Sequence, residues 1–371
     1  MIKSSSQTER IFGADLIRAV AITSVMLSHT LPGASTFAAV RAARGLFGYF
    51  GVEIFFVLSG YLIGAILLRS LFNDRLSSLP DLVVFWKRRW FRTLPNYYLF
   101  LLLNLGAARW SDGNWPASGW NFFWFGQGLL TEHPKFFTVA WSLAVEEWFY
   151  LTFPLLLWMT LKAFRNREIA FWLSVAVFLF VPLAFRGWMT GRDWDDGLRK
   201  VAVLRLDAIM FGVILAYLRE RRPARWHSLC SAWPLGIMGT AGLMIYLMAG
   251  HEMTVGSTFD RVFFFSATSL SLALLFPFVL MLKPPGENIT TQVHRLSLWS
   301  YSMYLSHAWL GQLLHSLFQV AGWSLHGVNA VVLSLLDWIA TLTVSAWLYS
   351  RYEKPLMELR ERSVKSMLSS R

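Results

Sequence analysis

Two ionisable side chains interrupt the first long apolar stretch of the sequence, and their types suit anion binding and proton transfer. Arg18 and His29 are eleven residues apart. On a helix with 3.6 residues per turn, both side chains lie on one face, separated by ~16 Å along the axis. Ionisable groups inside apolar helices are costly and usually functional. The shared face therefore favours a functional role, although a snorkelling arginine and an interfacial histidine explain either residue alone.

Carboxylates lie in two later apolar stretches, where they call for either acid–base chemistry or ion pairing. Glu53 precedes Ser59-Gly60, a pair of small residues that permits close approach of another helix. Glu146 and Glu147 are adjacent and point 100° apart on a helix, so we expect them to have different roles. His29 and Glu146 are expected at matched depth, which would suit general acid–base chemistry. A structural ion pair between Glu146 and an arginine is the main alternative.

Three further features could contact a ligand. Arg89 and Arg92 are three residues apart and share a face if their segment is helical. Guanidinium groups bind phosphate oxygens bidentately, but a basic cluster that contacts lipid headgroups is an equally simple explanation. Tyr304 and His307 lie one turn apart and could line a substrate site, although a packed histidine is the commoner case. The eight histidines are dispersed, with no HExxH pattern, and give no metal-binding signal.

The composition shows which kind of element must position these residues. Of the 371 residues, 55% are hydrophobic and 15% are charged, whereas a soluble domain carries about a quarter charged residues. The 19 tryptophans and 30 phenylalanines fit a membrane protein, because aromatic rings gather at membrane interfaces. We therefore predict an all-α, polytopic transmembrane helical bundle. The single cysteine, Cys230, does not indicate a redox compartment.

The predicted spans follow from the length of the apolar runs. A spanning helix needs roughly 20 mostly apolar residues, and residues 119–130 are too few to span and are expected at the interface. Met1–Arg10 is polar, so the first helix is expected to stay in place and not to act as a cleavable signal. Ten segments qualify as spans: 12–31, 46–70, 92–109, 138–162, 168–187, 201–218, 232–250, 262–282, 298–321 and 328–350.

Lysine and arginine then predict the orientation of these spans, because cytoplasmic loops are enriched in both. With the N-terminus cytoplasmic, 22 basic residues fall in the segments predicted inside and 9 in the loops predicted outside. Both termini are therefore predicted to be cytoplasmic. The net charge of +12 mostly reflects this topology and not a nucleic-acid-binding surface. We expect one membrane domain over 1–371, with spans over roughly 12–350, a cytoplasmic tail over 351–371 and no attached soluble domain.

Taken in order, these motifs resemble the acyltransferase-3 family of bacterial integral-membrane O-acyltransferases, over nearly the whole chain. One departure is Trp148, where the family commonly has glutamine. The matching positions are Asp15 with the R-x10-H pair Arg18 and His29, the FFxxSG motif Phe55-Phe56-Val57-Leu58-Ser59-Gly60, the RxxR pair Arg89 and Arg92, the WSLxxE motif Trp141-Ser142-Leu143 with Glu146, then Phe149-Tyr150, Arg205, Asp207, Gly212, Tyr304, His307 and Glu353-Lys354-Pro355.

The resemblance implies an O-acetyltransferase of the bacterial inner membrane with ten spans. It implies acyl-CoA, usually acetyl-CoA, as a cytoplasmic co-substrate, no bound cofactor, and a cell-surface carbohydrate or lipid-linked glycan as acceptor. By carry-over, Arg89 and Arg92 would hold the CoA phosphates and Arg18 would line the donor channel. His29 would act as catalytic base or transient acyl carrier, assisted by Glu146. Ser59, Tyr150, Tyr304 and His307 would contact donor or substrate.

Two alternatives stay open. A secondary transporter would also explain intramembrane charges, although such transporters often show broken helices in corresponding halves of the sequence, and none is evident. Within the family, the acyl group could be succinyl or longer, or the acceptor a small molecule. Membrane lipid is the remaining partner that the composition predicts.

Overall fold

The computed structural model describes residues 11–32, 37–73, 76, 78–249 and 257–360. Within these ranges every regular element is a helix, and no strand occurs. The predicted polar N-terminal segment, Met1–Arg10, and residues 361–371 of the predicted tail lie outside the described residues. The longer helices are α1 (Phe12–Thr30), α2 (Ala38–Phe72), α3 (Leu79–Asp112), α4 (Ala140–Phe164), α5 (Arg167–Trp188), α6 (Leu206–Arg221), α8 (Trp233–Met248), α9 (Phe264–Leu280), α10 (Glu287–Val320) and α11 (Val328–Leu348).

Short helical segments connect the longer ones. They are η1 (Gly119–Trp124), η2 (Asp195–Arg199), η3 (Ala202–Arg205), α7 (Pro223–Cys230), η4 (Phe259–Phe263) and η5 (Tyr349–Glu353). Each segment predicted to span overlaps one of the longer helices, and in three cases it also includes part of a short segment, namely η3, η4 or η5. The Trp-rich segment predicted at the interface contains η1, which is indeed far too short to cross a bilayer.

Length and hydropathy identify fewer spans than the sequence pattern does. Among the described residues, four helices are long and apolar enough to cross a membrane: Ala38–Phe72, Arg167–Trp188, Phe259–Leu280 and Val328–Arg360. A fifth is added if α7 and α8, which meet at 57°, form one bent span. Helices α1 and α4 are not among these four, and they carry Asp15, Arg18, Glu146 and Glu147, which lower their hydropathy.

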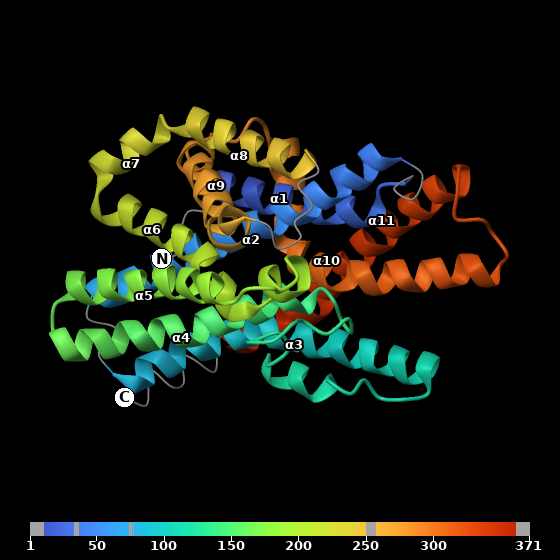
Figure 1. Cartoon of the computed structure of the whole chain (residues 1–371), viewed down its shortest axis with the longest axis horizontal. Helices are drawn as coiled ribbons and strands as arrows, with labels where there is room; N and C mark the ends of the chain where they lie inside the picture. Colours follow the sequence, from blue (N-terminus) through green and yellow to red (C-terminus); the bar gives the residue numbers. More distant parts are fainter. Residues whose placement is uncertain (1–10, 33–36, 74–75, 77, 250–256, 361–371) are drawn as a thin grey trace, which may run out of the picture.

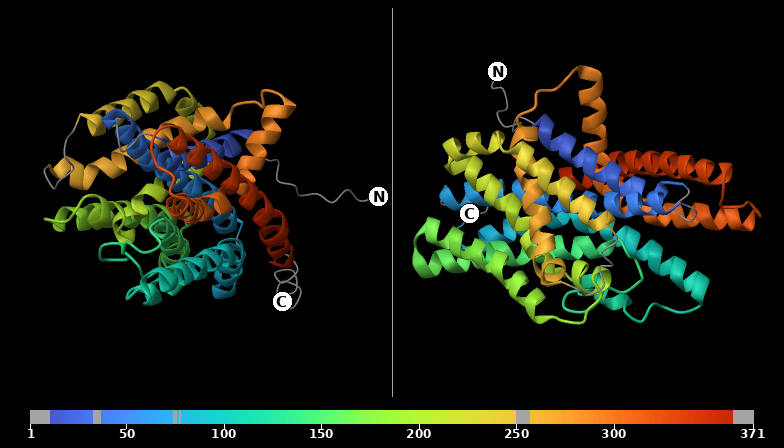
Figure 2. Two further views of the ribbon diagram at one scale, coloured as in Figure 1. Left: turned by 90° about the vertical axis from the view of Figure 1, so that its right-hand side faces the viewer. Right: turned by 45° about the horizontal axis from the view of Figure 1, so that its top comes forward.

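Most of the long helices run roughly along the longest axis of the molecule (Figure 1). Helix α2 lies inside the bundle, where α1, α4, α6, α8 and α9 all pack against it. Helices α4 and α5 pack on each other, as do α10 and α11, and the two further views in Figure 2 show the same arrangement. The central position of α2 explains why its Glu53 is completely buried.

The crossing of α2 and α6 depends on two glycines. A Cβ atom on Gly60 would lie 1.8 Å from the backbone oxygen of Ile209, and one on Gly212 would lie 1.9 Å from that of Val57. No real Cβ atom fits at such distances, so only glycine allows this contact between the two backbones. The structural interpretation of Ser59-Gly60 is therefore confirmed for Gly60.

Two ion pairs neutralise buried charges in the same region. Arg205 pairs with Glu53, whose second carboxylate oxygen accepts a hydrogen bond from Ser269 at 3.1 Å. Arg186 pairs with Asp207 at 2.7 Å. All four charged side chains are almost fully buried. Because buried charges are tolerated only when paired and hydrogen-bonded, Glu53 has a structural explanation that the sequence alone did not provide.

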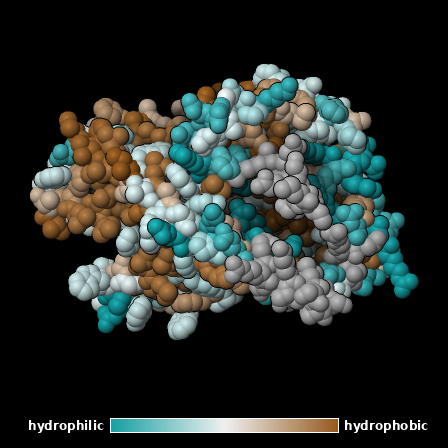
Figure 3. Space-filling model, turned by 180° about the vertical axis from the view of Figure 1, so that it is seen from behind, coloured by the Kyte–Doolittle hydropathy of each residue, from teal (hydrophilic) through white to brown (hydrophobic). Residues whose placement is uncertain are grey.

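The surface of the bundle is apolar over large areas. From behind, the lobe at the left of Figure 3, on the side where α10 and α11 turn, is largely hydrophobic, whereas hydrophilic side chains gather towards the opposite end. Helix α11 contributes Val328, Leu335 and Ile339, which are 58–78% exposed. Large exposed apolar areas of this kind are expected where a protein meets lipid.

Candidate active site

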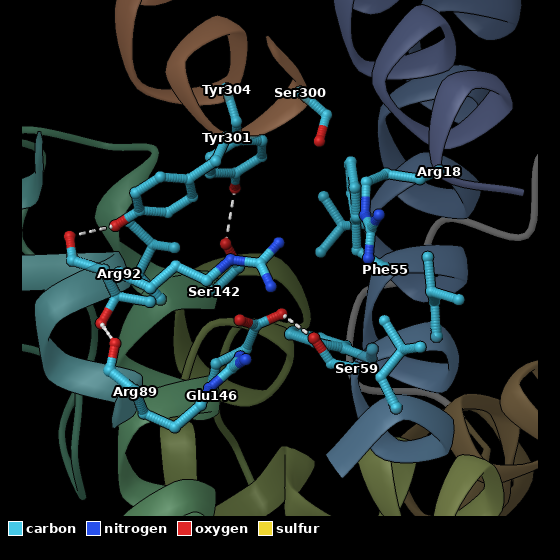
Figure 4. Close-up of a pocket in the computed structure, with 16 residues that line it drawn as sticks. Arg18, Phe55, Ser59, Arg89, Arg92, Ser142, Glu146, Ser300, Tyr301 and Tyr304 are labelled. Carbon is cyan, nitrogen blue, oxygen red and sulfur yellow. Dashed lines mark hydrogen bonds between the residues drawn. The ribbon is translucent and has the colours of Figure 1, made fainter. Parts of the chain in front are cut away.

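One cavity gathers most of the predicted site residues, and we call it the arginine cavity (Figure 4). It encloses about 760 Å³ of empty space, counting the part open to solvent. Arg18 approaches it from the side opposite Arg89 and Arg92, with Glu146 between them (Figure 4). The lining residues are Arg18, Val52, Phe55, Phe56, Leu58, Ser59, Leu62, Arg89, Arg92, Thr93, Ser142, Leu143, Glu146, Ser300, Tyr301 and Tyr304.

The early start of α3 places the two arginines in the wall of this cavity. Ser78 caps the helix, because its backbone nitrogen and its hydroxyl both donate to Asp81, at 2.9 and 2.7 Å. The helix therefore begins well before the predicted span 92–109. Arg89 and Arg92 are consequently helical, and their spacing of three residues puts them on one face, as the sequence predicted.

The Glu146 carboxylate is held by two hydroxyl groups. Ser59 donates to one oxygen at 2.8 Å, and Tyr150 donates to the other at 2.9 Å. The guanidinium of Arg89 lies over the ring of Tyr150, 4.3 Å from its centroid, a cation–π contact. In the described part of the chain, the Arg89 Nε is buried without a hydrogen-bond partner. The ring of Tyr150 thus positions the Arg89 guanidinium in the wall of the arginine cavity.

Arg18 is anchored to α10 by a polar cluster. It donates to Ser297 at 3.0 Å and lies 3.8 Å from Asp15. Ser297 donates in turn to Asp15 at 2.6 Å, and His294 is 3.3 Å from the same carboxylate. These contacts fix the α1 face that carries Arg18 against α10.

The closing motif of the sequence also supports the arginine cavity. Glu353 in η5 accepts hydrogen bonds from Asn96 of α3 and Ser302 of α10. Beside them, the Tyr301 hydroxyl donates to the backbone oxygen of Thr93 at 2.7 Å. The cluster ties the last described segment to the two helices that form one wall of the cavity.

A second cavity contains the two predicted histidines, and we call it the histidine cavity. It encloses about 1450 Å³, again counting open space. The rings of His29 and His307 meet edge to face, with centroids 4.7 Å apart. The lining residues are His29, Thr30, Leu31, Pro32, Arg44, Thr138, His307, Ala308, Gly311, Gln312, His315, Ser316, Leu325, Ala330, Leu333, Ser334 and Asp337.

Contacts at the end of α1 position His29. Arg44 of α2 donates to the backbone oxygen of Ser28 at 2.6 Å, and Ser334 of α11 donates to that of Thr30 at 2.5 Å. The last carbonyl groups of a helix have no partner within it, so these side chains fix the helix end. His29 remains exposed at the mouth of the cavity, whereas His307 is only 1% exposed.

Tyr304 separates the two cavities. Its hydroxyl lies 2.6 Å from that of Ser142 and 3.1 Å from the backbone oxygen of Val139. It lines the arginine cavity, while its ring centroid is 5.9 Å from that of His307, one turn further along α10. Tyr304 and His307 are thus neighbours on α10 that line different cavities.

The structure brings together most, but not all, of the predicted residues. Arg18, Ser59, Arg89, Arg92, Glu146 and Tyr304 line the arginine cavity, with Tyr150 hydrogen-bonded behind Glu146. His29 and His307 line the histidine cavity. The expected pairing of His29 with Glu146 in one site is not what the structure shows, because the two residues line different cavities. Two residues at similar depth along the membrane normal can still lie far apart in the plane of the membrane.

Sequence reasoning missed several lining residues. Asp337 could have been identified from the sequence, because it is an ionisable residue inside the predicted span 328–350. The same criterion singled out Glu53. Arg44, Thr93 and Tyr301 gave no comparable signal. Among the residues that the structure describes, no three His, Cys, Asp or Glu side chains cluster closely enough to hold a metal ion.

Comparison with known proteins agrees with this geometry. The acyltransferase-3 family, described as "Acyltransferase domain", matches residues 11–350. The chain belongs to this family. It is 27% identical over 267 residues to the O-acetyltransferase OatA of Staphylococcus aureus (strain NCTC 8325 / PS 47), covering 65% of this chain and 41% of that protein.

A second relative supports the same assignment to the acyltransferase-3 family. The putative peptidoglycan O-acetyltransferase YrhL of Bacillus subtilis (strain 168) is 33% identical over 173 residues, covering 42% of this chain and 25% of that protein. The chain thus spans less than half the length of these relatives. No solved structure matches it.

Proposed function

We propose that this acyltransferase-3 protein transfers an acetyl or similar short acyl group from acyl-CoA to a hydroxyl group of a cell-surface carbohydrate or lipid-linked glycan. The observation that carries the proposal is the pair of cavities on either side of Tyr304. One is lined by three arginines and the other by histidines. Transfer from an anionic donor to a neutral hydroxyl needs a cationic site for the donor next to a site with a base for the acceptor.

The arginine cavity suits acyl-CoA. CoA carries phosphate groups that guanidinium groups bind bidentately, and Arg89 and Arg92 lie on one helix face as such a contact requires. The same cavity has apolar walls from Val52, Phe55 and Leu62, which suit the thioester arm. In this proposal Glu146, with Ser59 and Tyr150, keeps Arg89 in place, and Arg18 closes the opposite side.

The histidine cavity suits a hydroxyl acceptor. Attack of the acceptor oxygen on the acyl carbon forms a C–O bond and breaks the C–S bond, and the hydroxyl proton must pass to a base. Histidine is suited to this task near neutral pH, and His29 is the catalytic residue at the mouth of this cavity. The names of the relatives, O-acetyltransferase and putative peptidoglycan O-acetyltransferase, support a carbohydrate acceptor.

We further propose that the chain crosses the bacterial inner membrane about ten times with both termini cytoplasmic. The excess of basic residues in alternate connections supports this orientation. It would place the donor cavity within reach of cytoplasmic acyl-CoA and the acceptor cavity towards the outer face. Surrounding lipid would cover the apolar flank.

Membranes with and without the chain, incubated with radiolabelled acetyl-CoA and solubilised peptidoglycan strands, test the function. We expect chain-dependent release of CoA thiol and base-labile label on the glycan. Label that crosses the vesicle membrane unchanged, without thiol release, would instead indicate a transporter.

A further inference from the structure

Asp337 of α11 is a buried carboxylate with only one hydrogen-bond partner among the described residues. Its Oδ1 accepts from Thr341, one turn along the same helix, at 3.2 Å. In the described part of the chain, Oδ2 has no hydrogen-bond partner and Asp337 forms no ion pair. The buried Glu53 and Asp207, in contrast, each pair with an arginine. Because a buried carboxylate is costly unless its oxygens are paired, Asp337 lacks the structural explanation that those two residues have.

The second carboxylate oxygen of Asp337 is open to the histidine cavity. Asp337 is 7% exposed and lines that cavity. Among the described residues, the enclosed side-chain atoms that lack a hydrogen-bond partner include His307 Nε2, but Asp337 Oδ2 is not one of them. Since Oδ2 has no partner there and is not enclosed, a ligand in the histidine cavity can reach it.

Gly311 of α10 leaves room for this carboxylate. A Cβ atom at Gly311 would lie 3.2 Å from Asp337 Oδ2, so any larger residue would crowd the carboxylate. His307 is four residues before Gly311, or ~6 Å along the helix axis, and its ring contacts that of His29. The Asp337 carboxylate thus lies one turn of α10 beyond the residue that His29 contacts, and Asp337 and His29 line the same cavity.

The chemistry of this position suits a hydroxyl group. A carboxylate only accepts hydrogen bonds, so its partner in the cavity must be a donor. Arg44, which lines the same cavity, instead donates to the backbone oxygens of Ser28 and His29. A carbohydrate carries several hydroxyl groups around one ring, so that one can bind Asp337 while another reaches His29. Hydrogen bonds to a charged carboxylate are also stronger than those to a neutral acceptor.

Resting on the proposed function, we propose that Asp337 accepts a hydrogen bond from a hydroxyl group of the carbohydrate acceptor other than the one that is acylated. His29 remains the catalytic base for the reacting hydroxyl. Because the two residues contact different hydroxyl groups of one acceptor, the spacing between them determines which hydroxyl meets the acyl donor. Asp337 is therefore an acceptor-binding residue that determines the position of acylation.

The test uses the full chain in proteoliposomes with acetyl-CoA and solubilised peptidoglycan strands. Losing a charge-assisted hydrogen bond weakens binding by roughly 10- to 150-fold, so Asp337→Asn should raise the KM for the strands by that factor and leave the KM for acetyl-CoA unchanged. Asparagine can still accept from Thr341, so the variant should melt at the wild-type temperature. Glu132→Gln is the matched control, because Glu132 is exposed in a loop predicted outside and lines neither cavity. Both KM values should then stay at the wild-type level.

Synthetic disaccharides of the glycan repeat, each lacking one hydroxyl group, identify the contact. The wild-type chain should lose roughly 10-fold or more in kcat/KM when one hydroxyl, distinct from the acylated one, is removed. Asp337→Asn should be insensitive to that same removal, because its contact is already lost.

Two results would overturn the role of Asp337. One is an unchanged KM for the strands in Asp337→Asn. The other is a wild-type chain that is insensitive to every hydroxyl but the acylated one, a measurement that does not depend on how the variant folds. No transfer by the wild-type chain would overturn the proposed function itself, so the two failures are distinguishable.

Discussion

The charged residues within the helices divide into two groups by what they contact. Arg205 and Arg186 are paired with Glu53 and Asp207 in a dry interior. Arg89, in contrast, lines the arginine cavity, where its guanidinium lies over the ring of Tyr150. Paired interior charges stabilise one arrangement of helices, whereas charges that line a cavity are available to a ligand.

Conservative substitutions of the arginine pair separate phosphate binding from a topological role. Losing a charge-assisted hydrogen bond costs about 1.5–3 kcal/mol, so Arg89→Ala and Arg92→Ala should raise the KM for acetyl-CoA by roughly 10- to 150-fold. Arg89→Lys and Arg92→Lys should recover only part of this loss, because lysine keeps the charge but lacks the planar fork. A donor titration in defined lipid measures the effect.

Arg88→Lys is the matched control for the arginine pair, since Arg88 is adjacent in sequence but is not among the residues that line the arginine cavity. Its donor KM should stay at the wild-type value. Positive-inside orientation counts lysine and arginine alike. An unchanged donor KM in both Arg89→Lys and Arg92→Lys would therefore reduce the pair to a membrane anchor and move the CoA site elsewhere.

The two adjacent glutamates should differ in their effect on activity. Glu146 lines the arginine cavity and accepts from Ser59 and Tyr150, whereas Glu147 is buried beside Thr93 and Trp90 of α3. Glu146→Gln removes the charge next to Arg89 and should lower acyl transfer at least tenfold. Glu147→Gln should change transfer less than threefold at equal protein amounts. Equal losses in an acyl-transfer assay would contradict this division of roles.

At the residue scale, the sequence singled out side chains that line the arginine cavity or are buried in the bundle, but it did not predict their partners. Arg18, Glu53 and Glu146 were identified because a charged side chain in lipid is costly. A charged residue within an apolar run can be recognised from the neighbouring sequence alone. Partners such as Arg205 for Glu53 depend on how distant helices pack. His29 and Glu146 were paired by depth alone, and the structure places them in different cavities.

The segments predicted to span are helical, but the lengths of the helices were predicted less well. Every predicted span overlaps a helix, because long apolar runs have few alternatives. Helix α3 begins at Leu79, thirteen residues before its predicted span, since polar residues outside lipid can continue a helix. The spacing of Ser78 and Asp81 matches a capping box, so the start of α3 could have been predicted from the sequence.

Close packing of α2 on α6 gives a prediction at the level of the elements. Gly60→Ala would place a Cβ atom 1.8 Å from the Ile209 oxygen, so the helices must separate. Such overpacking costs typically about 1–3 kcal/mol, and the melting temperature in detergent should fall by several degrees. Transfer activity should fall as well, because the shift displaces the neighbouring Ser59 from Glu146.

Gly45→Ala on the same helix is the control for Gly60→Ala. Nothing lies within 4 Å of a Cβ atom at this position, and alanine is favoured over glycine in a helix by about 1 kcal/mol. Its melting temperature should be equal to or slightly above the wild-type value. A Gly60→Ala protein as stable as Gly45→Ala would show that the α2–α6 contact is looser than described.

For the whole molecule, the main feature is that the residues predicted for the site line two cavities and not one. The arginine cavity and the histidine cavity meet at Tyr304, whose hydroxyl is engaged by Ser142. Composition predicted the class of protein, and the distribution of lysine and arginine gives an orientation that labelling can test. They could not predict that the site has two compartments, because that depends on how α1, α4 and α10 pack around one tyrosine.

The last prediction concerns the orientation of the chain, which decides the side of the membrane that each cavity faces. After replacement of Cys230 by alanine, single cysteines at Ala117 and Lys283 report opposite sides, since both positions are exposed and lie in loops predicted outside and inside. A membrane-impermeant maleimide added to intact cells should label Ala117→Cys and leave Lys283→Cys unlabelled until the membrane is opened. The physical reason is the excess of lysine and arginine in the inner connections. The reverse labelling pattern would invert the topology and place the arginine cavity away from cytoplasmic acyl-CoA.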